Sequence, residues 1–287
     1  MLNLSYPPHN RILIIGASGF IGNTLYKELL PYFDVYGTYA RQQDVYKDNN
    51  VFFQFNVEED SILNILKEVK PNVIISCFKG PHEAILKAHQ LLCDYIWAIQ
   101  GKLVLISSAS VFDAKGKYPS YENDVPLSES LEGKHKIALE KKVKELPEEH
   151  YCIARLPIIL GVNSTWVQQL KQAIKHQAAF EVHPNWVVSV NTEKKVAQQI
   201  HYLINQHLHG IYHLASEDVS HHDDIFKEIS RKLSFKSPIF KNVFHSNEDR
   251  YLAILPKENK LPQNYRITIE EVISDSTLKD EITTLKK

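Results

Sequence analysis

A short glycine-containing stretch near the start of the chain constrains its fold more than any other feature. Residues 11–22 read Arg-Ile-Leu-Ile-Ile-Gly-Ala-Ser-Gly-Phe-Ile-Gly, so an apolar run leads directly into three regularly spaced glycines. A run that is apolar on both faces is typical of a parallel strand buried between helices. The next segment, 23–30, places leucines four residues apart before Pro31, which predicts a helix. The glycines therefore lie on a strand-to-helix turn.

Each glycine has its own role if this turn binds a nucleotide. We expect Gly16 to permit the tight turn, Gly19 to let a pyrophosphate approach the backbone, and Gly22 to let helix and strand pack closely. The spacing is G-x-x-G-x-x-G rather than the commoner G-x-G-x-x-G. A purely structural turn is the alternative, but the strand before it and the helix after it favour a nucleotide site.

Composition excludes several classes of protein. The 287 residues are 44% hydrophobic, enough for a sizeable core, and a net charge of -1 gives no field that attracts nucleic acid or an anionic membrane. No stretch has the length and apolarity of a membrane span, and residues 1–10 lack a signal-peptide pattern. The cysteines have no metal-ligand spacing, and Cys77 and Cys152 lie in apolar runs that suit buried thiols in a reducing cytoplasm. We therefore expect a cytoplasmic protein with no nucleic-acid or membrane partner.

One run resembles a set of metal ligands, His221-His222-Asp223-Asp224. It lies where a helix is expected to begin, and acidic side chains there favour the positive end of the helix dipole. We interpret the run as a polar helix start and expect no metal.

Strand-like and helix-like segments alternate along the chain. Strands are expected at 35–41, 51–57, 73–77, 103–108, 151–156 and 210–215, and helices around 62–69, 82–100, 132–146 and 164–179. This alternation predicts an α/β fold with a doubly wound, Rossmann-like parallel sheet. We expect residues 1–160 to form the dinucleotide-binding domain, with 189–216 returning to it, and residues 161–188 and 217–287 to form a smaller C-terminal substrate lobe.

The end of the second expected strand indicates which dinucleotide binds. An acidic residue there would bind the free ribose hydroxyls, whereas an arginine suits a ribose 2′-phosphate. The chain has Arg41 and no acid before Asp44, so NADP is favoured over NAD, the alternative being a solvated surface arginine. We expect Asn56 and Val57, at the end of the third strand, beside the adenine ring. Lys79, after the fourth strand, either reaches the cofactor phosphates or faces solvent.

The order of these motifs resembles the extended short-chain dehydrogenase/reductase family, and within it the dTDP-4-dehydrorhamnose reductases. The resemblance is carried by residues 16–22, 106–113, 155–157 and 189–197. It implies NADP as cofactor and a nucleotide-linked keto-sugar or related carbonyl as substrate. It also implies cofactor contacts from Gly16, Ser18, Gly19, Phe20, Ile21, Gly22, Arg41, Asn56, Val57, Cys77, Phe78, Lys79, Lys136 and Pro157.

Members of this family use a tyrosine and a lysine four residues later on one helix, with a serine or threonine from the fifth strand. The lysine lowers the pKa of the phenol and holds the nicotinamide ribose, and the hydroxyl orients the substrate carbonyl. By resemblance Ser108 matches the hydroxyl and Lys136 the lysine, but Glu132 occupies the tyrosine position. The nearby Tyr121 belongs to the loop before this helix.

The glutamate changes the expected chemistry. A solvated glutamate has a pKa of about 4.3, which a neighbouring lysine lowers, so Glu132 would be ionised at neutral pH and unable to donate a proton. Three interpretations follow. The fold binds a nucleotide for a structural or regulatory purpose; a reductase uses another donor such as Tyr121, His135 or water; or Glu132 acts as a base in different chemistry on a nucleotide sugar.

Two functional hypotheses result. The first is an NADP-binding, atypical reductase of a nucleotide-linked sugar, in which Ser108 polarises the carbonyl and Lys136 holds the ribose. The second is a catalytically silent NADP-binding protein that regulates or assembles with a partner enzyme; a homodimer is compatible with either. Three aromatic residues lie in the expected substrate lobe: Trp166, His183 and Trp186. They could stack on a base or a sugar, but packing in the core or in a surface turn is favoured. Arg155, at the end of a buried strand, suits structural hydrogen bonding.

Overall fold

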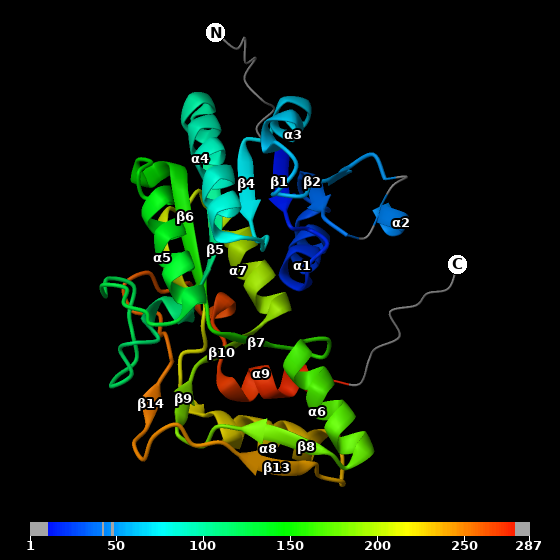
Figure 1. Ribbon diagram of the computed structural model, residues 1–287, viewed down its shortest axis with the longest axis vertical. Helices are drawn as coiled ribbons and strands as arrows, with labels where there is room; N and C mark the ends of the chain where they lie inside the picture. Colours follow the sequence, from blue (N-terminus) through cyan, green and yellow to red (C-terminus); the bar gives the residue numbers. More distant parts are fainter. Residues whose placement is uncertain (1–10, 42, 47–48, 279–287) are drawn as a thin grey trace. The chain divides into compact units, whose positions relative to one another are not determined.

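The computed structural model describes residues 11–41, 43–46 and 49–278, without the side chains of Gln43 and Asp44. The chain forms two compact units (Figure 1). Unit 1 comprises Met1–Ser108, Leu131–Arg155 and Ala197–Tyr212, and unit 2 comprises Ala109–Ser130, Leu156–Val196 and His213–Lys287. Within the described ranges, no helix combines the length and the apolarity needed to cross a membrane.

Unit 1 is built on a seven-stranded sheet in the order β11-β6-β5-β4-β1-β2-β3. Its strands are β1 (Arg11–Ile15), β2 (Asp34–Tyr39), β3 (Phe52–Gln54), β4 (Val73–Ser76), β5 (Lys102–Ser108), β6 (Tyr151–Leu156) and β11 (Gly210–His213). The strands from β3 to β5 pair in parallel. Strand order reverses between β1 and β4, which confirms the doubly wound, Rossmann-like fold. In such sheets ligands bind outside the carboxyl ends of the strands at this reversal.

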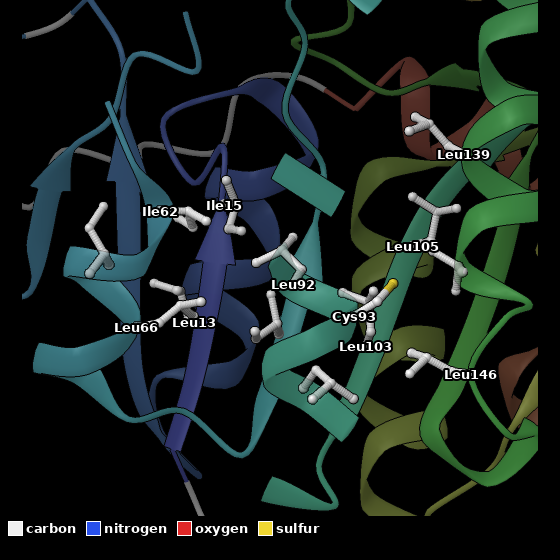
Figure 2. Packing of buried hydrophobic residues seen from close by; sticks show 14 of the residues in the cluster. Leu13, Ile15, Ile62, Leu66, Leu92, Cys93, Leu103, Leu105, Leu139 and Leu146 are labelled. Atoms are coloured by element: carbon white, nitrogen blue, oxygen red, sulfur yellow. The ribbon is translucent and has the colours of Figure 1, made fainter. Parts of the chain in front are cut away.

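Helices cover the sheet of unit 1. They are α1 (Phe20–Leu29), α2 (Gln43–Tyr46), α3 (Ile62–Val69), α4 (His82–Ile99), α5 (Leu131–Val143) and the part of α7 (Glu193–Asn205) that belongs to this unit; a 3-10 turn, η2 (Glu148–His150), precedes β6. Figure 2 shows Leu13 and Ile15 of β1 packed with Ile62, Leu66 and Leu92 from α3 and α4. Successive side chains of a strand point to opposite faces, so a strand buried on both faces reads as a continuous apolar run.

Several strands end earlier than the sequence predicts, among them β2 and β3. β2 ends at Tyr39 and β3 at Gln54, although strands at 35–41 and 51–57 are expected. The cause at β3 is local, because Asn56 begins a side-chain-stabilised turn: its Oδ1 accepts from the Glu58 N–H at 3.2 Å and its own N–H donates to Asp60 at 2.7 Å. Such Asx turns compete with the strand ladder.

Unit 2 combines short strand pairs with three helices. Its strands are β7 (Ile158–Leu160), β8 (Ala179–Val182), β9 (Trp186–Val188), β10 (Val190–Thr192), β12 (Ser220–His221), β13 (Ile239–Asn242) and β14 (Arg250–Tyr251); its helices are α6 (Thr165–His176), α8 (His222–Leu233) and α9 (Ile269–Ser276), with 3-10 turns η1 (Ala109–Phe112) and η3 (Gln263–Tyr265). β7 pairs with β10, β8 with β13, and β9 with both β12 and β14. The core of this unit includes Leu170, Phe180, Phe226 and Val272, so the three helices share it.

The run at 221–224 forms a helix start. His221 is the N-cap of α8 without a side-chain cap bond, and Asp223 and Asp224 lie in the first turn. Asp223 pairs with Lys227 one turn later at 2.6 Å. Among the residues whose placement is described, no group of three or more histidines, cysteines and acids is arranged to hold a metal.

Candidate dinucleotide-binding site

The turn between β1 and α1 excludes side chains at two positions. Gly16 has φ +91°, and a Cβ there would lie 2.9 Å from Phe78 Cα. A Cβ on Gly22 would lie 2.1 Å from the carbonyl oxygen of Gly16, so α1 approaches the turn as closely as backbone allows. A Cβ on Gly19 would meet Gly16 O at 3.3 Å and lie in open space on its other sides. The roles that the sequence assigns to the three glycines fit this geometry.

The start of α1 suits an anion. Gly19 is the N-cap, no side chain caps the helix, and no acidic residue lies in its first turn. The N–H groups of a first helical turn have no partner within the helix and carry the positive end of its dipole. β2 holds the turn from behind, because Thr38 Oγ1 accepts from the Gly16 N–H at 2.9 Å and Thr38 O accepts from the Ser18 N–H at 3.3 Å. The residues present therefore fit a linked pair of phosphates.

The segment after β4 forms the side of the turn. The Cys77 N–H donates to Ile15 O at 3.0 Å, and its thiol donates to the same oxygen at 3.2 Å. Burial raises the pKa of Cys77 to about 12, which makes it a structural thiol. Phe78 stacks on His89 of α4, with ring centroids 5.5 Å apart. Val57, from beyond β3, lies against this segment, since a Cβ on Gly80 would meet Val57 Cγ1 at 2.7 Å.

α5 adds a half-buried cation to unit 1. Lys136 Nζ donates to Ile106 O of β5 at 2.9 Å, two residues before Ser108. Burial lowers the pKa of Lys136, the carboxylate of Glu132 opposes that shift, and the Lys79 ammonium adds to it. Four candidate residues from the sequence thus interact electrostatically in unit 1: Cys77, Lys79, Glu132 and Lys136. Glu132 itself is exposed.

The other candidates come from other parts of the chain. Arg41 is exposed, two residues beyond the end of β2, and Asn56 uses its side chain in its own turn. Pro157 belongs to unit 2, as does Tyr121, whose ring lies 5.2 Å from Lys257 Nζ.

The aromatic candidates of unit 2 pack against one another. Trp166 contacts His222 and Phe226 with centroids 5.4 and 5.5 Å apart, and His183 stacks on Trp186 at 3.8 Å. Burial lowers the pKa of His222 to about 4, so this imidazole is neutral near pH 7.

Sequence reasoning missed several residues that support the site. Thr38 is hydrogen-bonded to Gly16 of the turn, from which it is 22 residues away in the sequence. His89 is hydrogen-bonded to Ser76 of β4 at 2.8 Å, at a sequence separation of 13 residues. Neither has a local signal, because a threonine in a strand and a histidine in a helix are ordinary. Knowledge of the strand order would have placed Thr38 beside Gly16, since β1 and β2 are neighbours.

Residues 10–251 match the model of one protein family, described as the RmlD substrate binding domain. The chain belongs to this family. A curated relative, methionine adenosyltransferase 2 subunit beta of Danio rerio, is 26% identical over 243 residues, which cover 74% of this chain and 71% of the relative. With its Bos taurus counterpart the identity is 30% over 168 residues, 54% of this chain and 48% of the relative, so that match spans about half the relative's length.

Solved structures share the fold. The dTDP-4-dehydrorhamnose reductase of Yersinia enterocolitica superposes with a TM-score of 0.74 at 19% identity, covering 93% of this chain and 99% of that one. The Bacillus anthracis enzyme of the same name, in complex with NADP, gives 0.72 at 21% identity, with 92% and 97% covered. Another neighbour, WbmH of Bordetella bronchiseptica, is in complex with NAD+ (TM-score 0.74, 15% identity, 93% and 97% covered). Proteins of this fold thus carry either nicotinamide dinucleotide.

Proposed function

We propose that this protein binds NADP(H) at the Gly16–Gly22 turn and serves a partner enzyme as a regulatory or scaffold subunit, without the family's usual hydride transfer to a keto-sugar. The observation that carries this proposal is Glu132, a carboxylate at the position of the proton-donating tyrosine, four residues before Lys136. An ionised carboxylate only accepts hydrogen bonds. Its charge would also repel the negative charge that develops on a carbonyl oxygen during reduction.

The cofactor part of the proposal is supported by charge and shape. The start of α1 offers N–H groups without acidic neighbours, and Lys79 and Lys136 supply positive charge beside the segment after β4. Arg41, past the end of β2, is of the type that suits a 2′-phosphate. A bound nicotinamide would supply the hydride chemistry of this fold class.

The regulatory part is supported by the names of the curated relatives. Both relatives described above are called subunit beta of methionine adenosyltransferase 2. The name denotes a subunit of an enzyme that is named for the adenosylation of methionine and not for the reduction of a keto-sugar. The partner we propose for this chain is therefore a methionine adenosyltransferase catalytic subunit.

A reductase remains the second candidate because of two retained residues. Ser108 ends β5, and Lys136 is held by the carbonyl of Ile106 on the same strand. In this function Ser108 polarises the substrate carbonyl, Lys136 holds the nicotinamide ribose, and water or His135 supplies the proton. The substrate class is a nucleotide-linked keto-sugar.

The two functions are separated by turnover. The first measurement is NADPH affinity by calorimetry, followed by NADPH oxidation with a panel of nucleotide-linked 4-keto-sugars. We expect binding without turnover in the wild type and in Glu132→Gln, which removes the charge but restores no phenol. Glu132→Tyr should gain turnover if the rest of the site is intact. Turnover by the wild type at the rate of a dTDP-4-dehydrorhamnose reductase measured in parallel would contradict the proposal.

The partner is tested by co-purification. The chain and the methionine adenosyltransferase of the same organism are mixed and separated by size-exclusion chromatography, with and without NADPH. We expect a complex and a change in the partner's turnover rate. Separate elution under both conditions would contradict the regulatory role while leaving nucleotide binding untouched.

A further inference from the structure

Four aromatic rings from four elements of unit 1 lie in contact near the β1–α1 turn. Tyr39 of β2 stacks on Tyr46 of α2, with centroids 5.1 Å apart and planes at 24°. Tyr46 stacks on Phe52 of β3 at 4.6 Å and 17°, and Phe52 meets the edge of Tyr26 of α1 at 4.8 Å and 61°. We call these four residues the aromatic column.

The aromatic column is fixed to the turn through β2. A Cβ on Gly37 would lie 2.6 Å from Ala17 Cβ and 2.7 Å from Phe52 Cε1, so the Phe52 ring occupies the space that Gly37 leaves. The next residue, Thr38, accepts the hydrogen bond from Gly16. One short stretch of β2 therefore holds both the glycine turn and the base of the column.

The other end of the column holds the connection that carries Arg41. β2 ends at Tyr39 and α2 ends at Tyr46, so the Tyr39–Tyr46 stack joins the two ends of this connection. α2 has only four residues, and a helix this short has little stability of its own. Its position beside the sheet therefore depends on the packing of Tyr46 between Tyr39 and Phe52.

We infer that Tyr46 is a positioning residue that holds the Arg41 connection in place for a ribose 2′-phosphate, and thereby sets a preference for NADP(H) over NAD(H). The inference rests on the proposed dinucleotide binding. An arginine–phosphate contact is strong when the guanidinium is already ordered, because the cost of ordering the chain is then not subtracted from the binding free energy. NAD(H) lacks the phosphate, so it gains nothing from an ordered Arg41.

The test compares NADPH and NADH affinities, measured by fluorescence titration, in variants of the full chain. Tyr46→Ala removes the two stacked contacts of this ring. We expect a roughly two- to twelve-fold fall in the NADPH/NADH affinity ratio, which corresponds to about 0.5–1.5 kcal/mol, the contribution of one such contact. The NADH affinity should stay unchanged. Tyr46→Phe keeps the ring and should keep the ratio. Tyr32→Ala is the control, since the Tyr32 ring packs against His201 elsewhere in unit 1, with centroids 4.7 Å apart and planes tilted by 43°.

A double variant separates positioning from a direct contact by Tyr46. If Tyr46 acts through Arg41, then Arg41→Ala removes the preference, and adding Tyr46→Ala to it lowers the ratio no further. Additive losses would overturn the inference, as would equal losses for NADPH and NADH in Tyr46→Ala or an unchanged ratio. Absence of any dinucleotide binding by the wild type would overturn the proposed function together with this inference, whereas an unchanged ratio with intact binding overturns the inference alone.

Discussion

Arg155 and Glu140 form a bidentate ion pair in the interior of unit 1. Arg155 Nε donates to Glu140 Oε1 at 2.9 Å and Nη2 donates to Oε2 at 2.7 Å, with side chains that are 0% and 2% exposed. Ser107 Oγ also donates to Oε1, at 2.6 Å. The pair joins β6 to α5, and Ser107 adds β5. Lys136 lies one turn before Glu140 on α5. The same contacts therefore fix the position of Lys136 along the strands of the sheet.

Removing the charge of Glu140 should destabilise the protein strongly. Glu140→Gln leaves the Arg155 guanidinium buried without a counter-charge, and the expected loss is about 3–5 kcal/mol in the free energy of unfolding. Urea denaturation followed by circular dichroism measures it. Glu145→Gln is the matched control, because Glu145 pairs with Lys142 at 2.8 Å but is 58% exposed. This substitution should change the free energy of unfolding by about 0.5 kcal/mol or less. Similar losses in both variants would contradict the role assigned to the buried pair.

Two glycine-to-alanine substitutions should separate folding from nucleotide binding. Gly22→Ala places a methyl group 2.1 Å from Gly16 O, so α1 must move. Such overpacking costs about 1–3 kcal/mol, and we therefore expect the melting temperature to fall by several degrees. Gly19→Ala meets that oxygen at 3.3 Å and should fold nearly normally while losing dinucleotide affinity. Calorimetric titration of NADPH into both proteins, with thermal melts, checks the pair. Wild-type affinity in Gly19→Ala would show that the open side of this turn does not hold the phosphates.

The sequence predicts the turn and the sheet because their signals are local. An apolar run, three glycines and a helical pattern within residues 11–30 suffice to place the β1–turn–α1 unit, and the alternation of elements predicts a doubly wound parallel sheet. The supporting contacts are long-range and carry no such signal. The position of Arg155 at a strand end predicts structural hydrogen bonding, yet nothing local identifies Glu140 as its partner. The Tyr39–Tyr46 stack likewise depends on how α2 packs, which periodicity does not encode.

Acid should destabilise both units through buried neutral histidines. Burial lowers the pKa of His89 and of His222 to about 4, whereas a histidine in the unfolded chain has a pKa of about 6.5. Well above pH 6.5 neither the folded nor the unfolded state binds a proton at these histidines, so they make the free energy of unfolding independent of pH there. Below it the unfolded state is protonated first, and each histidine lowers the free energy of unfolding by about 2 kcal/mol at pH 5.

Urea midpoints at pH 7.5 and pH 5 measure this loss. His89→Gln and His222→Gln should each be less stable at pH 7.5 but lose less on acidification than the wild type. His176→Gln, at an exposed position, is the control and should follow the wild type. Equal pH dependence in all four proteins would exclude these two imidazoles as its source.

The three thiols should be unreactive in the native protein. Burial raises the pKa of Cys77, Cys93 and Cys152 to about 12 in each case, and only the thiolate attacks a disulfide reagent. At pH 8 we expect modification by 5,5′-dithiobis(2-nitrobenzoate) to be slow and to follow opening of the structure. All three thiols should react rapidly in 8 M urea, which is the control for reagent and protein quality. The Cys77 thiol contacts the glycine turn at Gly16 O, 3.7 Å away, so a saturating dinucleotide should slow its modification further. Modification of any one of the three in the native protein as fast as in urea would contradict its assignment as a structural thiol.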